Sequence, residues 1–224
     1  MEEIKRKTVT LLGATGLIGS HLLDLLVQDE TIEKIYVPLR REMNFSHKKI
    51  ESTVIDFANK KALCQMISPS DAVFCAVGTT IKKVGGDLEL YRKIDFDIPL
   101  NAARCCLETA CPHFLLVSSV GADSQSKNFY LKLKGETENA LIALDLPALS
   151  IFRPSMLLGK RAEFRFGESV GQALMPLFSF LIPSKYRPIQ ARTVAQAMIQ
   201  YSKKNLYGAH FYHFSEMINL DLPE

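Results

Sequence analysis

Residues 8–20 read TVTLLGATGLIGS, and this stretch decides the fold. Its first five residues are β-branched or aliphatic and predict a strand, while the apolar pattern from residue 17 onward predicts a helix. Gly13, Gly16 and Gly19 stand between the two, where glycine permits a tight turn and lets backbone approach a ligand. The N–H groups at a helix start favour an anion. The stretch therefore predicts a dinucleotide-binding turn, with glycines needed only for strand–helix packing as the alternative.

The rest of the chain alternates strand-like and helix-like segments. Short apolar runs predict strands at residues 34–39, 50–55, 72–77, 114–117, 148–152 and 209–214. Helical patterns lie at residues 58–67, 88–109, 128–144 and 193–203, and Pro99 predicts a kink or a restart in the second of them. This alternation predicts an α/β fold, a doubly wound and mostly parallel Rossmann sheet with helices on both faces. Ligands of such a sheet bind at the carboxyl ends of its strands.

The chain of 224 residues contains no stretch that is typical of a linker, so we expect a single domain over residues 1–224. Residues 155–190 break the rhythm of strands and helices and are rich in aromatic residues, glycine and proline. We expect this segment to form a small C-terminal cap over the substrate. Ordinary core packing together with an oligomer contact explains the same composition equally well.

Composition and charge favour a small-molecule partner. Hydrophobic residues make up 47% of the chain, charged residues 23%, and the net charge is only +3, which does not indicate nucleic acid or an anionic membrane. The first residues, MEEIKRK, lack the apolar core of a secretory signal, and the longest apolar run, near residues 173–182, is too short to span a bilayer. We therefore expect no integral membrane segment and a cytoplasmic protein.

The cysteines and histidines indicate neither a disulfide framework nor a metal site. The five cysteines form no C-x-x-C pair and stand mostly in apolar segments, so buried thiols in a reducing compartment are expected. The five histidines are scattered over segments that we expect to lie apart. No bound metal is expected.

Two arginines follow the expected second strand. At this place a fold that selects NAD usually has an acidic residue for the ribose hydroxyls, and this chain has Arg40 and Arg41. A guanidinium group forms paired hydrogen bonds with a phosphate and is unsuited to a bare diol. The pair therefore predicts the 2′-phosphate of NADP(H), with two solvated charges at a strand end, next to Glu42, as the alternative.

Polar residues also follow the third and fourth expected strands. Asp56 could accept a hydrogen bond from the adenine amino group or from the backbone at residue 57, or serve only as the N-cap of the next helix. Gly78, Thr79 and Thr80 place small, polar backbone beside the expected diphosphate and ribose, although a plain exit from the strand explains them too. The remaining cofactor contacts expected at this edge come from the glycine loop: Gly13, Thr15, Gly16, Leu17, Ile18 and Gly19.

Serine, tyrosine and lysine side chains form a second constellation. Ser118 and Ser119 end the fifth strand, and Tyr130 and Lys134 stand four apart on the following helix, so that they project from one face. An ammonium about 5 Å from a phenol favours the phenolate by ~3 kcal/mol at an effective dielectric near ~20, which makes Tyr130 a usable proton donor near neutral pH. Lys134 can also hold the nicotinamide ribose. Ser119 can bond the carbonyl oxygen that gains charge during hydride addition.

These residues give the chain a resemblance to a known superfamily. GATGLIG, LLVSSVGAD, the spacing Tyr130-x-x-x-Lys134 and the segment Phe152-Arg153-Pro154 together resemble the short-chain dehydrogenase/reductases in their atypical NAD(P)-binding branch. More narrowly, the chain is similar to the Tat-interacting-protein group of oxidoreductase-like proteins. Four motifs carry this likeness: Arg40-Arg41, Gly78-Thr79-Thr80, Ser118-Ser119-x-Gly121-Ala122-Asp123 and Lys134-Gly135-Glu136. The resemblance covers about residues 8–153 and, more loosely, residues up to 199.

The resemblance implies NADPH as the cofactor and assigns roles to individual residues. Ser119, Tyr130 and Lys134 would occupy the catalytic positions, and Ser118 would line the nicotinamide pocket. The backbone bordering the nicotinamide would come from Arg153, Pro154 and Met156. One position departs from the pattern, because many relatives carry an asparagine where this chain has Asp95, and a carboxylate cannot donate the hydrogen bond of an amide.

Two functions of different classes follow. The first is an NADP(H)-dependent oxidoreductase that transfers hydride between nicotinamide and a carbonyl or alcohol substrate, with Tyr130 as the acid/base. The alternative, raised by the resemblance, is an NADP(H)-binding regulatory or interaction protein, with a protein partner or as a homodimer, and with little or no turnover. The retained Ser119, Tyr130 and Lys134 favour the first, since a pure binder has no chemical need of them. A sugar-nucleotide epimerase or dehydratase shares these residues but usually needs a larger carboxyl-terminal region than residues 155–224.

Overall fold

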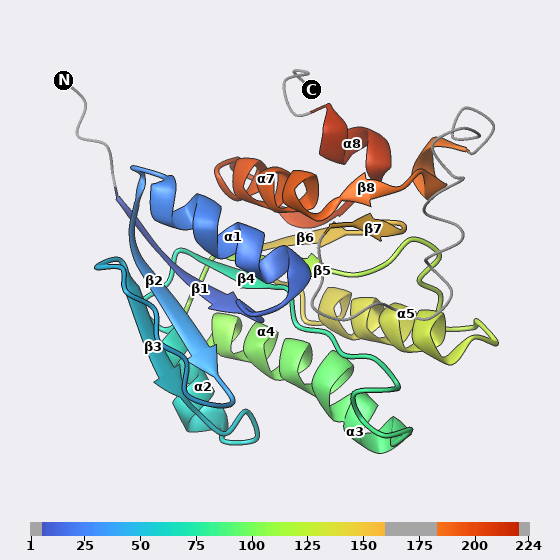
Figure 1. Cartoon of the computed structure of the whole chain (residues 1–224), viewed down its shortest axis with the longest axis horizontal. Helices are drawn as coiled ribbons and strands as arrows, with labels where there is room; N and C mark the ends of the chain where they lie inside the picture. The colour runs from blue at the N-terminus through green and yellow to red at the C-terminus, as the bar shows by residue number, and fades with distance from the viewer. Residues whose placement is uncertain (1–5, 160–182, 220–224) are drawn as a thin grey trace.

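In the computed structural model, which describes residues 6–159 and 183–219, a parallel sheet lies between two layers of helices (Figure 1). The strands of this sheet in the described residues are β1 Lys7–Leu12, β2 Ile32–Leu39, β3 Ile50–Val54, β4 Ala72–Cys75, β5 His113–Val117, β6 Ala148–Phe152 and β9 Gly208–Tyr212. They lie in the order β3-β2-β1-β4-β5-β6-β9, and each neighbouring pair is parallel. A separate small sheet pairs β7 (Leu157–Leu158) with β8 (Ile189–Gln190). The doubly wound Rossmann sheet predicted from the sequence is confirmed.

Helices cover both faces of this sheet. The helical segments of the described residues are α1 Leu17–Gln28, α2 Lys60–Ile67, α3 Leu88–Arg92, the π-helical η1 Lys93–Asp97, α4 Ile98–Glu108, α5 Phe129–Ile142, the 3₁₀-helical η3 Ser184–Tyr186, α7 Ala191–Ser202 and α8 Phe214–Ile218. On one face α1 packs against α7, and on the other face α2, α4 and α5 lie side by side (Figure 1). Each layer therefore covers one side of the sheet.

The strand order places a crevice at the carboxyl ends of β1 and β4. From β1 the chain moves outward to β2 and β3, and it then returns to β4 on the other side of β1. The crossovers on the two sides of this point lie on opposite faces of the sheet, so the loops diverge above it. In doubly wound folds this switch point is where ligands bind.

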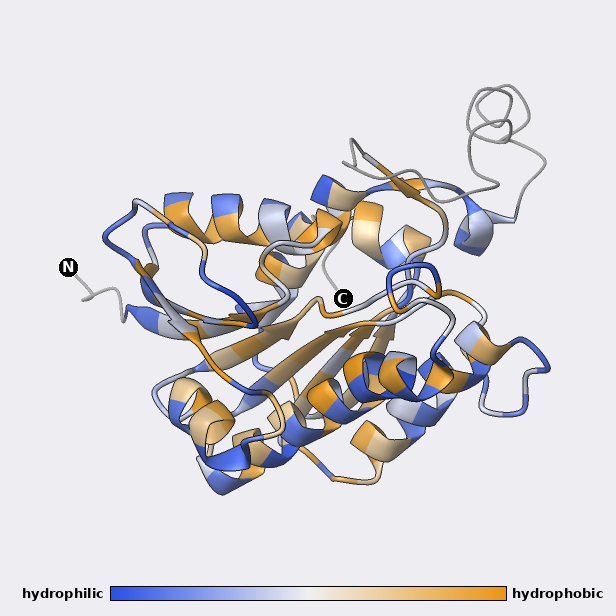
Figure 2. Ribbon diagram, turned by 60° about the horizontal axis from the view of Figure 1, so that its bottom comes forward, coloured by the Kyte–Doolittle hydropathy of each residue, from blue (hydrophilic) through white to orange (hydrophobic). Residues whose placement is uncertain are grey.

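Two apolar cores flank the sheet. One lies under α1 and α7 and includes Leu11, Leu22 and Met198, which are fully buried. The other lies under α2, α4 and α5 and includes Phe114 and Leu141. Figure 2 shows the hydrophobic residues on the strands and on the helix faces turned to the sheet, with hydrophilic residues outside. Full burial of one such large side chain stabilises the fold by about 1.5–3 kcal/mol.

The region around Pro99 differs in detail from the prediction. A break at this point was expected, but it takes the form of the π-helical turn η1 that precedes the proline. Pro99 follows η1 directly within one continuous helix, where its missing N–H removes one intrahelical bond, and the π-helical turn accommodates it. β3 also differs, because it lies at the sheet edge with residues 51–54 exposed, whereas coverage on both faces was expected.

The expected cap at residues 155–190 is described only at its two ends. Residues 157–158 and 189–190 form the small parallel sheet β7-β8, which the sequence did not predict. Residues 160–182 lie outside the described residues, and with them Phe164, Phe166, Phe178 and Phe180, four of the aromatic residues that motivated the cap; the fifth, Tyr186, is exposed at the end of η3.

Cys64 and Cys105 correct the expectation of buried thiols. A disulfide joins them, and their Cα atoms lie 4.9 Å apart. They are 41 residues apart in the sequence, on α2 and α4, and only tertiary packing brings these two helices together. The expectation holds for Cys75, Cys106 and Cys111, which are buried free thiols.

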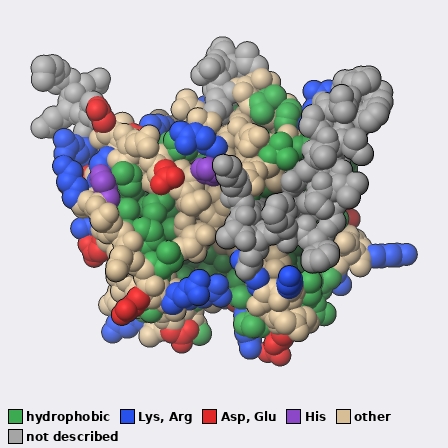
Figure 3. Space-filling model, in the orientation of Figure 1, with side chains coloured by type: hydrophobic (Ala, Val, Ile, Leu, Met, Phe, Trp, Pro, Cys, Tyr) green, Lys and Arg blue, Asp and Glu red, His purple; other side chains and the backbone are tan. Residues whose placement is uncertain are grey.

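The surface carries charge of both signs. On the face drawn in Figure 3, Lys and Arg side chains are interspersed with Asp and Glu side chains. This distribution fits the small net charge of +3. Within residues 6–159 and 183–219, no helix combines the length and the apolar character needed to cross a membrane.

Acid should destabilise the fold through His113 on β5. The ring is buried and lies 2.9 Å from Ser150 Oγ, and burial, followed by the positive charges of Lys7 and His210, lowers the pKa of His113 to about 4. The folded state therefore binds fewer protons than the unfolded state. Stability is fully present above pH ~6.5 and is lost as the pH falls toward ~4, by about 2 kcal/mol between pH 7 and 4.5.

Urea unfolding of the wild type and of His113→Gln at these two pH values measures this contribution. The variant should lose less stability on acidification than the wild type, because its amide does not titrate. Equal losses in the two proteins would show that His113 does not carry the effect.

Candidate functional site

The glycine turn between β1 and α1 has the geometry expected of a ligand-binding loop. Gly13 has a φ of +83°, and a Cβ atom there would lie 2.6 Å from the carbonyl oxygen of Ala76. A Cβ at Gly19 would lie 2.0 Å from the carbonyl oxygen of Gly13. Both glycines are therefore required by the fold itself. Gly16 is less restricted, because its φ is −79° and a Cβ there would lie 3.2 Å from the carbonyl oxygen of Gly13; its lack of a side chain also leaves the backbone open to the close approach of a ligand.

The start of α1 has uncapped backbone N–H groups that are able to bind an anion. Its N-cap is Gly16, no side chain caps the first turn, and no acidic residue stands there. The amide N–H groups of Leu17 and Ile18 are the first of the helix and have no intrahelical acceptor. A dinucleotide diphosphate fits this set, because backbone N–H groups and the positive end of the helix dipole both favour it. Thr15, exposed in the same turn, lies where it can add a hydroxyl.

Arg40, Arg41 and Asp56 lie farther along the same edge of the sheet. The arginines follow β2 and Asp56 follows β3, and these strands are neighbours. Both arginines are exposed, and neither forms an ion pair with any residue of the described ranges. Asp56 Oδ1 accepts a hydrogen bond from the Ala58 N–H at 2.9 Å. The N-cap role considered for Asp56 is wrong, since Asn59 caps α2.

Side-chain hydrogen bonds hold the loop after β4 in place. The N–H of Thr79, which is buried, donates to Asp95 Oδ2 at 2.8 Å, and the Tyr91 hydroxyl donates to the Thr79 carbonyl at 3.2 Å. Gly78 and Thr80 flank this fixed point, and Gly78 is exposed. The strand exit is therefore fixed by side chains of α3 and η1, and its backbone remains accessible beside the glycine turn.

Tyr130, Lys134 and Glu138 form a stripe along α5. Each stands four residues after the one before it, so the three side chains share one face of the helix. Lys134 is buried, with its Nζ 6.0 Å from the Tyr130 ring centroid and 3.1 Å from Asp95 Oδ1. Tyr130 is partly buried. The structure thus brings together the tyrosine and lysine that the sequence singled out.

Asp95 changes the electrostatics expected for this pair. Burial is the largest single effect and would lower the pKa of Lys134, but the charge and hydrogen bond of Asp95 together with the nearby tyrosines outweigh it, and the pKa is raised. Lys134 is therefore held as an ammonium, and a carboxylate of opposite charge neutralises it at contact distance. The isolated ammonium assumed from the sequence is corrected to an ion pair. Asp95 accepts hydrogen bonds here, where the asparagine implied by the resemblance would also donate.

Glu138 is the functional-site residue that the sequence analysis missed. It is buried and accepts a hydrogen bond from the Ser118 hydroxyl, with 2.5 Å between Oγ and Oε1. Arg153 binds the same carboxylate with two nitrogens, Nε at 3.0 Å and Nη2. The signal that could have found Glu138 is its helical spacing from Lys134.

The exits of β5 and β6 run together at this point. The Ser118 N–H donates to the Phe152 carbonyl at 2.7 Å, and the Val120 N–H donates to the Pro154 carbonyl at 2.9 Å. Ser119 lies between these bonds, with a partly exposed side chain whose Oγ is 3.3 Å from the carbonyl oxygen of Val120. A substrate oxygen could replace this long contact.

Met156 continues this backbone away from the sheet. Its carbonyl accepts a hydrogen bond from the Ile189 N–H at 3.0 Å, next to the small β7-β8 sheet. Pro154 is buried and Met156 is partly buried. The predicted residues therefore lie along one edge of the sheet in two groups, one over β1 to β3 and one over β5 and β6, with the β4 exit between them. This arrangement suits an extended ligand.

Comparison with known proteins identifies the family of this chain. The profile of a family described as NAD(P)H-binding matches residues 13–173. Protein HTATIP2 of Rattus norvegicus is 34% identical over 169 residues, which cover 74% of this chain and 69% of the relative. Protein FMP52, mitochondrial, is 36% identical in Saccharomyces cerevisiae over 73% of both chains and 30% identical in Candida albicans over 88% of this chain and 89% of that protein. The resemblance predicted from the sequence motifs is confirmed.

Solved structures support the fold alone. A UDP-N-acetylglucosamine 4-epimerase from Methanobrevibacter ruminantium, solved with UDP-N-acetylmuramic acid, superimposes with a TM-score of 0.71 at 16% identity, over 93% of this chain and 77% of that one. MoeE5 in complex with UDP-glucuronic acid and NAD gives a TM-score of 0.71 at 14% identity, over 91% and 75%. At such identities the likeness extends to the arrangement of strands and helices.

Removal of the Glu138 charge should destabilise the protein. In Glu138→Gln the guanidinium of Arg153 loses its buried counter-ion, and breaking such a pair costs about 3 kcal/mol. The matched control is Glu136→Gln on the same helix, whose partner Arg92 is a surface residue, so that the loss stays under about 1 kcal/mol.

Chemical denaturation of the two variants measures both free energies of unfolding. A loss at Glu138 no greater than the loss at Glu136 would contradict the structural role given to the buried pair.

Proposed function

The chain belongs to the NAD(P)H-binding family of Rossmann proteins, and from this membership we propose that it is an NADP(H)-dependent oxidoreductase of the short-chain type. Its reaction would be hydride transfer between nicotinamide and a small carbonyl or alcohol substrate. The observation that carries the proposal is the stripe on α5. It sets Tyr130 beside a buried ammonium at the carboxyl edge of the sheet and is linked through Glu138 to Ser118.

The preference for NADP(H) rests on Arg40 and Arg41. They stand after β2, where the ribose of a dinucleotide bound at the glycine turn would lie. Their exposed guanidinium groups suit the dianionic 2′-phosphate of NADP(H). The ribose diol of NAD is usually bound by a carboxylate, which these two side chains do not provide. The family match supports a nicotinamide dinucleotide as the ligand, and the two arginines support the form that carries a 2′-phosphate.

The side chains of the site divide the remaining work. A bound nicotinamide supplies or accepts the hydride. Tyr130 would move a proton at its hydroxyl oxygen, and Ser119 would hydrogen-bond the substrate oxygen on which charge develops. Since Asp95 neutralises Lys134, we assign Lys134 chiefly to orienting the tyrosine and the ribose, with a weaker electrostatic effect on the phenol.

A second function is favoured by the same ion pair. An NADP(H)-binding regulatory or interaction protein needs a rigid cofactor site but no acidic phenol, and Asp95 both fixes Lys134 and weakens its field. The retained Ser119, Tyr130 and Lys134 remain the argument for catalysis. From the composition we propose that the protein is cytoplasmic. The alternative is the mitochondrion, which is part of the name of the FMP52 relatives, and cell fractionation distinguishes the two locations.

The arginine pair gives a test of cofactor choice. In the double variant Arg40→Ala, Arg41→Ala, loss of the charge-assisted bonds to the 2′-phosphate should weaken NADPH binding about 10- to 100-fold, while NADH binding changes little. Arg104→Ala, at an exposed position on α4, is the matched control.

Calorimetric titration of both coenzymes into the three proteins measures the effect. Equal weakening for NADPH and NADH, or none for either, would remove the arginines from the phosphate site.

Tyr130 tests the chemistry. Tyr130→Phe should lower kcat for NADPH-dependent carbonyl reduction by about 10²- to 10⁴-fold, because the proton donor is gone, with a much smaller change in the Kd of NADPH. Tyr207→Phe is the control, since the Tyr207 side chain is 84% exposed.

The assay is NADPH oxidation with a panel of aldehydes and ketones. Undiminished turnover by Tyr130→Phe would rule out the acid/base role. A wild type that binds NADPH tightly and reduces no member of the panel would favour the binding protein.

A further inference from the structure

The disulfide between Cys64 and Cys105 lies outside the nucleotide site, on the opposite helical layer from α1. It ties α2 to α4, which pack side by side on the sheet. Nothing in hydride transfer requires this bond. The proposed catalysis therefore does not explain this disulfide.

The two cysteines differ in access to solvent. Cys105 is fully buried, with 0% of its surface exposed. Cys64 is partly exposed and opens on a surface hollow of about 570 Å³ between α2 and α4. Only Cys64 can therefore be reached by a reagent while the protein is folded.

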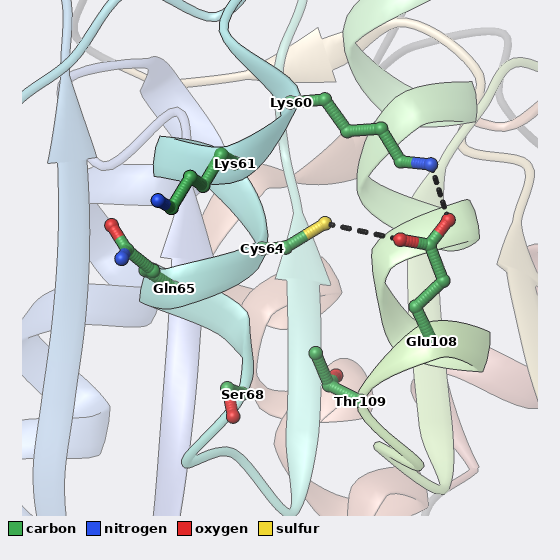
Figure 4. Close-up of a pocket in the computed structure, with 7 residues that line it drawn as sticks. All are labelled: Lys60, Lys61, Cys64, Gln65, Ser68, Glu108 and Thr109. Atoms are coloured by element: carbon green, nitrogen blue, oxygen red, sulfur yellow. Dashed lines mark hydrogen bonds and ion pairs between the residues drawn. The ribbon is translucent and has the colours of Figure 1, made fainter.

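The rim of the hollow is polar and carries both charges. Figure 4 shows the Cys64 sulfur pointing toward α4, where its Sγ lies 3.9 Å from Glu108 Oε2. Glu108 is in turn paired with Lys60, with 2.5 Å between Oε1 and Nζ, and Lys61 and Gln65 extend from the same helix as Cys64. Lys60 offsets the carboxylate that would otherwise repel an anionic thiolate. A small polar thiol can therefore approach this sulfur.

We propose that Cys64 is a thiol–disulfide exchange site for low-molecular-weight thiols of the glutathione class, with Cys105 as its resolving cysteine. The Cys64 thiolate attacks one sulfur of glutathione disulfide, forming a mixed disulfide and releasing one glutathione thiolate, which takes up a proton. The Cys105 thiol then loses its proton and attacks Cys64 Sγ, which closes the Cys64–Cys105 bond and expels the second glutathione. Two protein thiols are oxidised and one glutathione disulfide is reduced. Excess glutathione drives the same steps in reverse, beginning at Cys64.

The other cysteines provide an internal control. Cys75, Cys106 and Cys111 are buried and free, and burial raises the pKa of Cys75 to about 11. A buried thiol reacts slowly because a reagent in solution does not reach it. Exchange in the folded protein is therefore confined to the α2–α4 pair.

The disulfide joins two helices that are each close in sequence to a residue of the candidate nucleotide site. α2 follows β3 and Asp56, whereas α4 is continuous with η1, which contains Asp95. The proposal nevertheless stands apart from the oxidoreductase assignment, because it requires neither a bound nucleotide nor turnover.

Two serine variants test the exchange site. Both Cys105→Ser and Cys64→Ser lack the disulfide, so they differ only in which sulfur remains. Incubated folded with glutathione disulfide, Cys105→Ser should accumulate one glutathione on Cys64. Cys64→Ser should react at least about tenfold more slowly, because Cys105 is buried. The wild type, reduced beforehand, should end as the Cys64–Cys105 disulfide without a lasting adduct.

Intact-mass and peptide-mass measurements locate the adduct. Equal rates in the two folded variants, or no adduct on folded Cys105→Ser while the urea-unfolded variant reacts, would overturn the proposal. If a variant does not fold, the wild type answers the same question: brief reduction by glutathione in the folded state, followed by alkylation in urea, should label Cys105 and leave a glutathione on Cys64. Reduction by a dithiol protein such as a thioredoxin but not by glutathione would equally overturn it, since it would move the specificity from small thiols to a protein.

Discussion

Two ion pairs with buried carboxylates on the inner side of α5 hold this site together. Lys134 pairs with Asp95, and Glu138 pairs with Arg153. A charge removed from water is tolerated only when a partner compensates it, so each pair fixes the distance between the elements that carry it. Through these contacts α5 is joined to η1 on one side and to the exit of β6 on the other. The position of Tyr130 follows from this attachment, because it stands on the same face of the same helix.

Hydrogen bonds extend each pair to a neighbouring strand exit. The carboxylate of Asp95 receives Lys134 on one oxygen and the Thr79 N–H on the other, which fixes the loop after β4. Glu138 receives Arg153 and the Ser118 hydroxyl, which fixes the residue before Ser119. Three strand exits and one helix face thus meet through two carboxylates. The π-helical turn η1 carries the first of these carboxylates, in keeping with the frequent occurrence of such turns at functional sites.

The same arrangement bears on what the site can do. A lysine whose charge is neutralised at 3.1 Å acts on a nearby phenol mainly as a dipole, and a dipole weakens faster with distance than a lone ammonium does. In the proposed functions, positioning of the cofactor and of Tyr130 would therefore be the stronger contribution of Lys134. Both proposed functions need that positioning, and they differ in whether the phenol also transfers a proton.

The sequence by itself determined the local elements. The glycine turn, the apolar strands and the amphipathic helices follow from residues close together in the chain, and the parallel sheet follows from their alternation. Tyr130 and Lys134 were found for the same reason, since helical spacing places them on one face. Spacing identifies a face but not the residues it meets, and the contacts of Asp95 with Lys134, of Glu138 with Ser118 and of Cys64 with Cys105 all join different elements. Only the packed fold decided them, because each depends on which strands and helices become neighbours.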